Sequence, residues 1–214
     1  MSRSPLIVHP DTTVLLPPRL CGAVGYYAVA ARYGNAVADY GMRFDKRQKS
    51  VHRLDIADTR GQMTLTVPIA KPETTSGARW ADIRVSTHGQ WWDVHRVALE
   101  SAYGRTPFFE FYIDRFLPLL APRHEGECET VAELDAAFDL IIRDILGIPA
   151  PAAIAPGAPV DDFRRHLPEV ADLPYYQIRA GKLGFIPGLS ILDLIFNLGP
   201  ESPLHLHRLI STRE

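Results

Sequence analysis

Three side chains in this sequence have the chemistry of an acid–base or nucleophilic centre: His95, Asp193 and Cys21. His95 shares a helical stripe with Trp91 and other apolar residues, so we expect it on the core-facing side of a helix over residues 91–103. An imidazole that titrates near neutral pH can donate or accept a proton during a reaction. The alternative is a histidine that packs in the core and satisfies a neighbouring polar group.

Asp193 and Asn197 lie four residues apart in a strongly apolar segment, which places them on one face of a helix. Ser190 is the expected N-cap of that helix, and Gly199 is expected to end it. Two interpretations follow. Both side chains satisfy backbone groups near the helix ends, or they form the polar floor of a pocket in which Asp193 orients His95 and Asn197 binds substrate.

Cys21 opens a predicted helix over residues 21–33. A thiol at a helix N-terminus has a lowered pKa, and this is where a nucleophilic cysteine would lie. The alternative is a small buried core residue.

The densest basic run lies between residues 43 and 53 and is interrupted only by Asp45. Its members are Arg43, Lys46, Arg47, Lys49, His52 and Arg53. Arginines and lysines on a loop and strand bind phosphate or carboxylate, and a nucleotide-linked sugar offers two phosphates. Lys49, His52 and Arg53 are the substrate-binding residues of this hypothesis, and the loop over residues 71–79 is long enough to fold over the site. The alternative is a solvated edge strand that its charges protect from aggregation.

The elements that must position these residues change in type along the chain. Short strands are predicted in the N-terminal half, over residues 5–9, 12–16, 36–40, 50–56, 63–69 and 81–85, with a hairpin turn allowed at 58–61. Helices are predicted over residues 91–103, 108–120, 130–147 and 190–198, and at the C-terminus. The pattern predicts an α+β fold in a single domain over residues 1–214, with a small mixed or antiparallel sheet from the N-terminal half packed with the helices of the C-terminal half. Residues 149–160, rich in proline and alanine, are expected to form a surface loop.

Composition excludes several classes of function. The 23 basic and 25 acidic residues give a net charge of −2, so neither nucleic acid nor an anionic membrane surface is indicated as a partner. No segment approaches about 20 uninterrupted apolar residues, so we expect no membrane insertion. Nucleotide-binding, hydrolase and metalloprotease motifs are absent, and we predict no cofactor and no metal. His205 and His207 fall in the expected terminal helix, where a spacing of two does not place them on one face. Two distant cysteines suit a reducing compartment, and we expect a soluble, cytoplasmic protein whose oligomeric state the sequence leaves open.

Two blocks of sequence resemble the WbqC-like protein family. They are LPYYQIRAGKLGFIPGLSILDLIFNLGPES (residues 173–202) and WWDVHRVALESAYGRTPFFEFY (residues 91–112). The resemblance implies that residues 173–202 pack back on the main domain and bring Tyr175 and Tyr176 to the site as aromatic faces. In the basic run, His52 stands where the family pattern expects asparagine.

The family's genes tend to lie among those for bacterial O-antigen and other surface-glycan synthesis, so the resemblance implies a role in that pathway. One hypothesis is an enzyme that transfers an acyl or aminoacyl group to an activated amino sugar. The other is a non-catalytic binding or accessory module of the same pathway.

Overall fold

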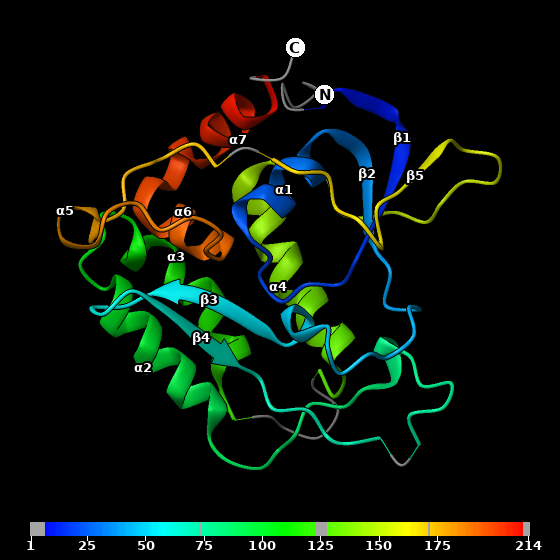
Figure 1. Cartoon of the computed structure of the whole chain (residues 1–214), viewed down its shortest axis with the longest axis horizontal. Helices are drawn as coiled ribbons and strands as arrows, with labels where there is room; N and C mark the ends of the chain where they lie inside the picture. The colour runs from blue at the N-terminus through cyan, green and yellow to red at the C-terminus, as the bar shows by residue number, and fades with distance from the viewer. Residues whose placement is uncertain (1–6, 73, 123–127, 171, 212–214) are drawn as a thin grey trace.

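The computed structural model describes residues 7–72, 74–122, 128–170 and 172–211, and its fold is mixed α and β as the sequence predicted (Figure 1). The helices are α1 (Val24–Ala31), α2 (Trp91–Tyr103), α3 (Phe109–Phe116), α4 (Val131–Leu146), α5 (Ala180–Leu183), α6 (Ile191–Leu198) and α7 (Ser202–Ser211). Short 3₁₀ turns occupy Lys49–Val51 (η1), Trp80–Asp82 (η2), Leu117–Leu120 (η3) and Gly199–Glu201 (η4).

The strands form two small sheets where the sequence predicted one. The first is parallel and has the order β2-β1-β5, made by β1 (His9–Leu16), β2 (Tyr33–Ala38) and β5 (Val160–Asp162). The second is an antiparallel hairpin of β3 (Arg53–Ala57) and β4 (Gln62–Thr66), closed by a hydrogen bond from the Asp58 amide to the Gly61 carbonyl (2.8 Å). The predicted hairpin turn is therefore confirmed. The restriction of the sheet to the N-terminal half is wrong, because β5 comes from the C-terminal half.

Two predicted segments near the N-terminus have different boundaries in the structure. Residues 9–16 form one strand whose register shifts between His9 and Thr13, where the sequence predicted a turn; residues 5 and 6 lie outside the described part. The helix predicted over 21–33 is shorter, since it begins after Ala23 and ends before Tyr33, which enters β2. Helix α1 is thus the crossover that parallel strands β1 and β2 require.

Several helix ends follow their local sequence signals. Thr130 caps α4 in a capping box with Glu133, and Gly147 ends the helix in the left-handed region at φ 68°. Ser190 caps α6 by accepting from the Leu192 amide, and Gly199 ends it at φ 50°. The segment predicted as a strand over 81–85 instead begins within the η2 turn and forms two isolated bridges, Ile69 with Val85 and Arg84 with Thr130.

Helix α6 is the centre of the core. Seven of its eight residues are buried, and it contacts α1, α2, α3, α7 and β3. In Figure 1, the β3–β4 hairpin lies beside α2 on one side of the molecule, and the parallel sheet lies on the other side of α4. The two sheets are therefore held by a common helical core.

Candidate functional site

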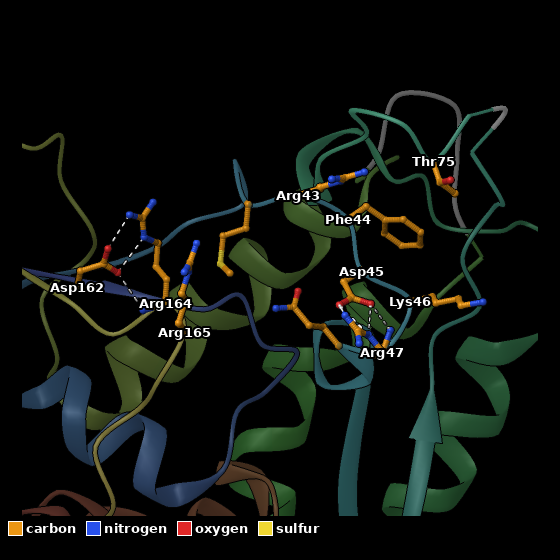
Figure 2. Close-up of a pocket in the computed structure, with 11 residues that line it drawn as sticks. Arg43, Phe44, Asp45, Lys46, Arg47, Thr75, Asp162, Arg164 and Arg165 are labelled. Carbon is orange, nitrogen blue, oxygen red and sulfur yellow. Dashed lines mark hydrogen bonds and ion pairs between the residues drawn. The ribbon is translucent and has the colours of Figure 1, made fainter.

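A basic cavity of about 730 Å³ lies at one edge of the parallel sheet (Figure 2). Its volume lies within the usual range of ligand pockets, about 300–1,000 Å³. Five basic side chains line it against two carboxylates: Arg43, Lys46, Arg47, Arg164 and Arg165, with Asp45 and Asp162. Met42, Phe44, Gln48 and Thr75 complete the lining.

The topology explains why distant segments meet there. Strands β2 and β5 both run parallel to β1, on either side of it, so their carboxyl ends point to the same edge of the sheet. The loop over residues 42–48 follows β2, and residues 162–165 lie at the end of β5. In open parallel sheets, ligands bind in the crevice outside the carboxyl ends of the strands.

Each wall of the cavity contains one arginine held by an aspartate. Arg47 donates to Asp45 from Nε and Nη2, with the closest contact at 2.8 Å, and its backbone amide donates to the same carboxylate. Arg164 donates from Nε and Nη2 to Asp162 and from Nη1 to Asp39 (2.7 Å). These hydrogen bonds from Arg47 and Arg164 lower the pKa values of Asp45 and Asp162 to about 2, so both carboxylates are ionised at neutral pH.

The three remaining cations of the lining are exposed. Arg43, Lys46 and Arg165 form no side-chain hydrogen bond or ion pair with any residue that the structure describes. They are therefore available to an anionic ligand, and the lining has a formal excess of three positive charges.

Sequence reasoning found half of this site. The basic run supplies Arg43, Lys46 and Arg47, but the lining stops at Gln48, because the η1 turn carries the chain into β3. The proposed ligands Lys49, His52 and Arg53 lie outside the lining. His52 is buried with Nδ1 2.9 Å from the Val67 carbonyl, and burial lowers its pKa, so it is not a cation at neutral pH.

Arg164 and Arg165 were missed, although the sequence carries a signal for them. The run DDFRRH over residues 161–166 follows the proline- and alanine-rich segment directly and is the only place in the sequence where two arginines adjoin. Because the run is short and contains two acids, it reads as a solvated loop. Only the pairing of β5 with β1 brings it beside the first basic run.

His95 lies on α2 as predicted and is 3% exposed. Its ring donates to the Thr66 carbonyl and packs edge-on against Trp91 at a centroid distance of 5.2 Å, while Nε2 has no hydrogen-bond partner among the described residues. Burial lowers its pKa to about 4, so it is neutral at pH 7. His95 lines none of the described cavities.

Asp193 does not orient His95. Its carboxylate accepts hydrogen bonds from the Tyr175 hydroxyl (2.6 Å) and the Gln177 amide (2.9 Å), and burial raises its pKa. His95, in contrast, bonds Thr66 on β4. Asp193 thus fastens residues 175–177 to the central helix.

Asn197 has the same kind of role as Asp193. Its amide nitrogen donates to the Asp193 carbonyl (2.8 Å), and its oxygen accepts from the Ile178 amide (3.0 Å). Both polar groups of Asn197 are therefore used within the fold. Of the two tyrosines predicted as aromatic faces, Tyr175 turns inward to Asp193, whereas Tyr176 is 57% exposed. Neither tyrosine lines the basic cavity.

The structure favours the alternative for Cys21, a small buried core residue. Cys21 precedes the N-cap Ala23 and is only 2% exposed, so it is not in the first turn of α1. Burial, with the nearby carboxylates of Asp135 and Asp139, raises the pKa of the thiol well above its ordinary value. A protonated thiol is a poor nucleophile.

A buried polar stripe on α4 was not anticipated. Asp135, Asp139 and Arg143 follow one another at intervals of four residues, and Asp135 and Arg143 are each 1% exposed. Asp139 accepts from the Tyr27 hydroxyl (3.0 Å) and from Arg143, whose other nitrogens reach the carbonyls of Ala36 and Pro149. The stripe ties α4 to α1, to β2 and to the start of the 149–160 segment.

A model of the WbqC-like protein family matches residues 18–171. The chain belongs to this family. Both walls of the basic cavity fall within the matched residues, as do Cys21 and His95. Asp193 and Asn197 do not, since the matched region ends before the C-terminal block that carried part of the resemblance.

Comparison of this WbqC-like chain with curated proteins and with solved structures found no match. Within the described residues, no group of three or more histidine, cysteine or acidic side chains is arranged to hold a metal ion. In the same part of the chain, none of the helices combines the length and apolar character needed to cross a bilayer.

Proposed function

We propose that this protein serves bacterial surface-glycan synthesis of the O-antigen type by binding the phosphate or carboxylate groups of an activated sugar in the basic cavity. The observation that supports the proposal is the meeting of two arginine-containing walls at the carboxyl edge of the parallel sheet. Membership of the WbqC-like family is the reason for choosing this pathway.

The chemistry of the lining favours an anionic ligand over a neutral one. A guanidinium offers a planar fork that matches phosphate and carboxylate, and charge-assisted hydrogen bonds are stronger than neutral ones. The excess of basic side chains also attracts anions at a distance, an effect that salt screens.

Binding is better supported than catalysis. Acyl or aminoacyl transfer to an amino sugar needs a group that removes a proton from the attacking amine. Among the residues that line the cavity, Asp45 and Asp162 have pKa values of about 2 and are weak bases. His95 and Cys21 are buried outside it. We therefore favour the binding or accessory role over the transferase.

The proposal is tested by thermal unfolding in the presence of sugar phosphates, nucleotide sugars and sugar carboxylates at constant ionic strength. A ligand that binds only the folded chain raises the melting temperature by mass action. Arg43→Gln should reduce the shift, whereas Arg60→Gln, on the distant hairpin turn, should not. If no anionic sugar raises the melting temperature, the proposal is refuted.

A second test is made in cells. Retention of surface glycan in cells that carry only the Arg43→Gln, Arg165→Gln double variant would refute the assigned pathway.

A further inference from the structure

The two walls of the basic cavity have the same construction. On the first wall, Asp45 holds Arg47 through its side chain and its backbone amide, which fixes the loop that also carries Arg43 and Lys46. On the second wall, Asp162 holds Arg164, and Arg165 follows it directly. Each wall therefore has one neutralised arginine and at least one free cation.

Arg164 also fixes the walls relative to each other. Its three guanidinium nitrogens are all used, two on Asp162 at the end of β5 and one on Asp39, which follows β2. Asp39 lies a few residues before Arg43 in the same loop. The cross-link holds the ends of two strands together without any ligand, and such preorganisation favours binding because less freedom is lost.

Figure 2 shows the free cations on both sides of the hollow, with Arg165 beside Arg164 and with Arg43 and Lys46 on the opposite side. A single phosphate can be satisfied by one wall. A ligand that uses both walls must present two anionic groups.

We propose that the cavity selects a diphosphate, as in a nucleoside diphosphate-linked sugar, with Arg43 and Lys46 binding one phosphoryl group and Arg165 the other. This inference rests on the proposed function and narrows its ligand class. Arg47 and Arg164 act as positioning residues, since their guanidinium groups are engaged by Asp45 and Asp162.

The test is a calorimetric titration of the full chain with uridine diphosphate and uridine monophosphate, and with the adenosine pair, at constant ionic strength and with EDTA so that no divalent cation shares the charge. We expect each diphosphate to bind about tenfold more tightly than its monophosphate, since one added charge-assisted contact gives an effect of this size. Inorganic pyrophosphate should likewise bind more tightly than inorganic phosphate.

Two variants separate the walls. Arg43→Gln and Arg165→Gln should each lower diphosphate affinity about tenfold, and the double variant should lose the preference for diphosphate over monophosphate. Both side chains are exposed and form no side-chain hydrogen bond or ion pair with the described residues, so the variants should keep the wild-type melting temperature. Arg60→Gln is the matched control and should bind as the wild type does.

The outcomes distinguish this inference from the general proposal. Equal affinity for monophosphate and diphosphate, or an effect of only one wall, overturns the two-wall site and leaves an anion-binding cavity in place. If neither pyrophosphate nor any sugar phosphate or carboxylate binds, both proposals fail.

Discussion

Arg164 donates a 2.7 Å hydrogen bond to Asp39, and the pair joins the ends of β5 and β2 across the central strand β1. The Arg164 and Asp39 side chains are 36% and 24% exposed, so solvent weakens the attraction. We expect a double-mutant cycle with Arg164→Gln and Asp39→Asn, measured by urea unfolding, to give a coupling of about 0.5–1 kcal/mol.

The larger effect of breaking this cross-link should fall on ligand binding. Asp39→Asn leaves every cation of the cavity in place, so weaker diphosphate binding by this variant would show that the walls must be held at a fixed separation. Unchanged affinity together with a coupling near zero would mean that the ion pair orders neither the fold nor the site.

Gly34 is required by the close approach of β2 to the start of β1. A Cβ at this position would lie 1.9 Å from the Pro10 carbonyl oxygen, a backbone atom that cannot move away alone. We expect Gly34→Ala to destabilise the protein by about 2 kcal/mol or more in urea unfolding, as overpacking commonly does.

Gly181→Ala is the control, since a Cβ there meets nothing within 4 Å. It lies in α5 and should be neutral or stabilising by about 0.5–1 kcal/mol. Equal effects at the two glycines would contradict the close approach.

Asp135 should reduce stability at neutral pH. It is 1% exposed, and neither carboxyl oxygen meets hydrogen-bond geometry with any described residue, although the Tyr40 hydroxyl approaches it. Burial, with the charge of Asp139, raises its pKa well above the ordinary value. The folded state therefore holds a proton that the unfolded state releases, so this group's contribution to stability falls as pH rises above the unfolded pKa of about 4.

Asp135→Asn removes this titration. We expect the variant to gain about 1–3 kcal/mol in free energy of unfolding at pH 8, with a smaller gain at pH 5. Asp144→Asn, on the solvent side of the same helix with a side chain 74% exposed, is the matched control. Destabilisation of Asp135→Asn at both pH values would mean that the carboxylate has a partner or a role beyond this burial.

Local signals predicted the helices well. Thr130 with Glu133 marks the start of α4, and Gly147 and Gly199 mark helix ends because each adopts a positive φ that glycine tolerates best. The sheets were harder, since β5 is three residues long and its pairing with β1 depends on where the chain returns after α4. No local pattern encodes such a parallel contact.

The same non-local contact explains why the sequence predicted only one wall of the basic cavity. Arg43 and Arg47 were found because basic residues adjoin in the sequence, whereas Arg164 and Arg165 reach the cavity only through the pairing of β5. His52 is buried outside the lining of this cavity, because it ends the η1 turn, and composition does not show where that turn directs the chain. A run of charges predicts a basic surface, but the topology decides which members share it.

His95 should contribute to stability and not to chemistry, because it is buried, neutral and bonded to the Thr66 carbonyl. Its folded pKa of about 4 lies below the ordinary histidine pKa of 6.5, so its contribution is present above pH 6.5 and is lost as pH falls toward 4, by up to about 3 kcal/mol. Urea unfolding of His95→Gln should show a weaker loss of stability between pH 7 and pH 5 than the wild type. His88→Gln, at an exposed position, should keep the pH dependence of stability that the wild type shows.

The diphosphate affinity of folded His95→Gln should be unchanged, because the ring lines no part of the basic cavity. A stable His95→Gln protein that binds the ligand normally but cannot restore surface glycan in cells would instead restore His95 as a proton-transfer residue.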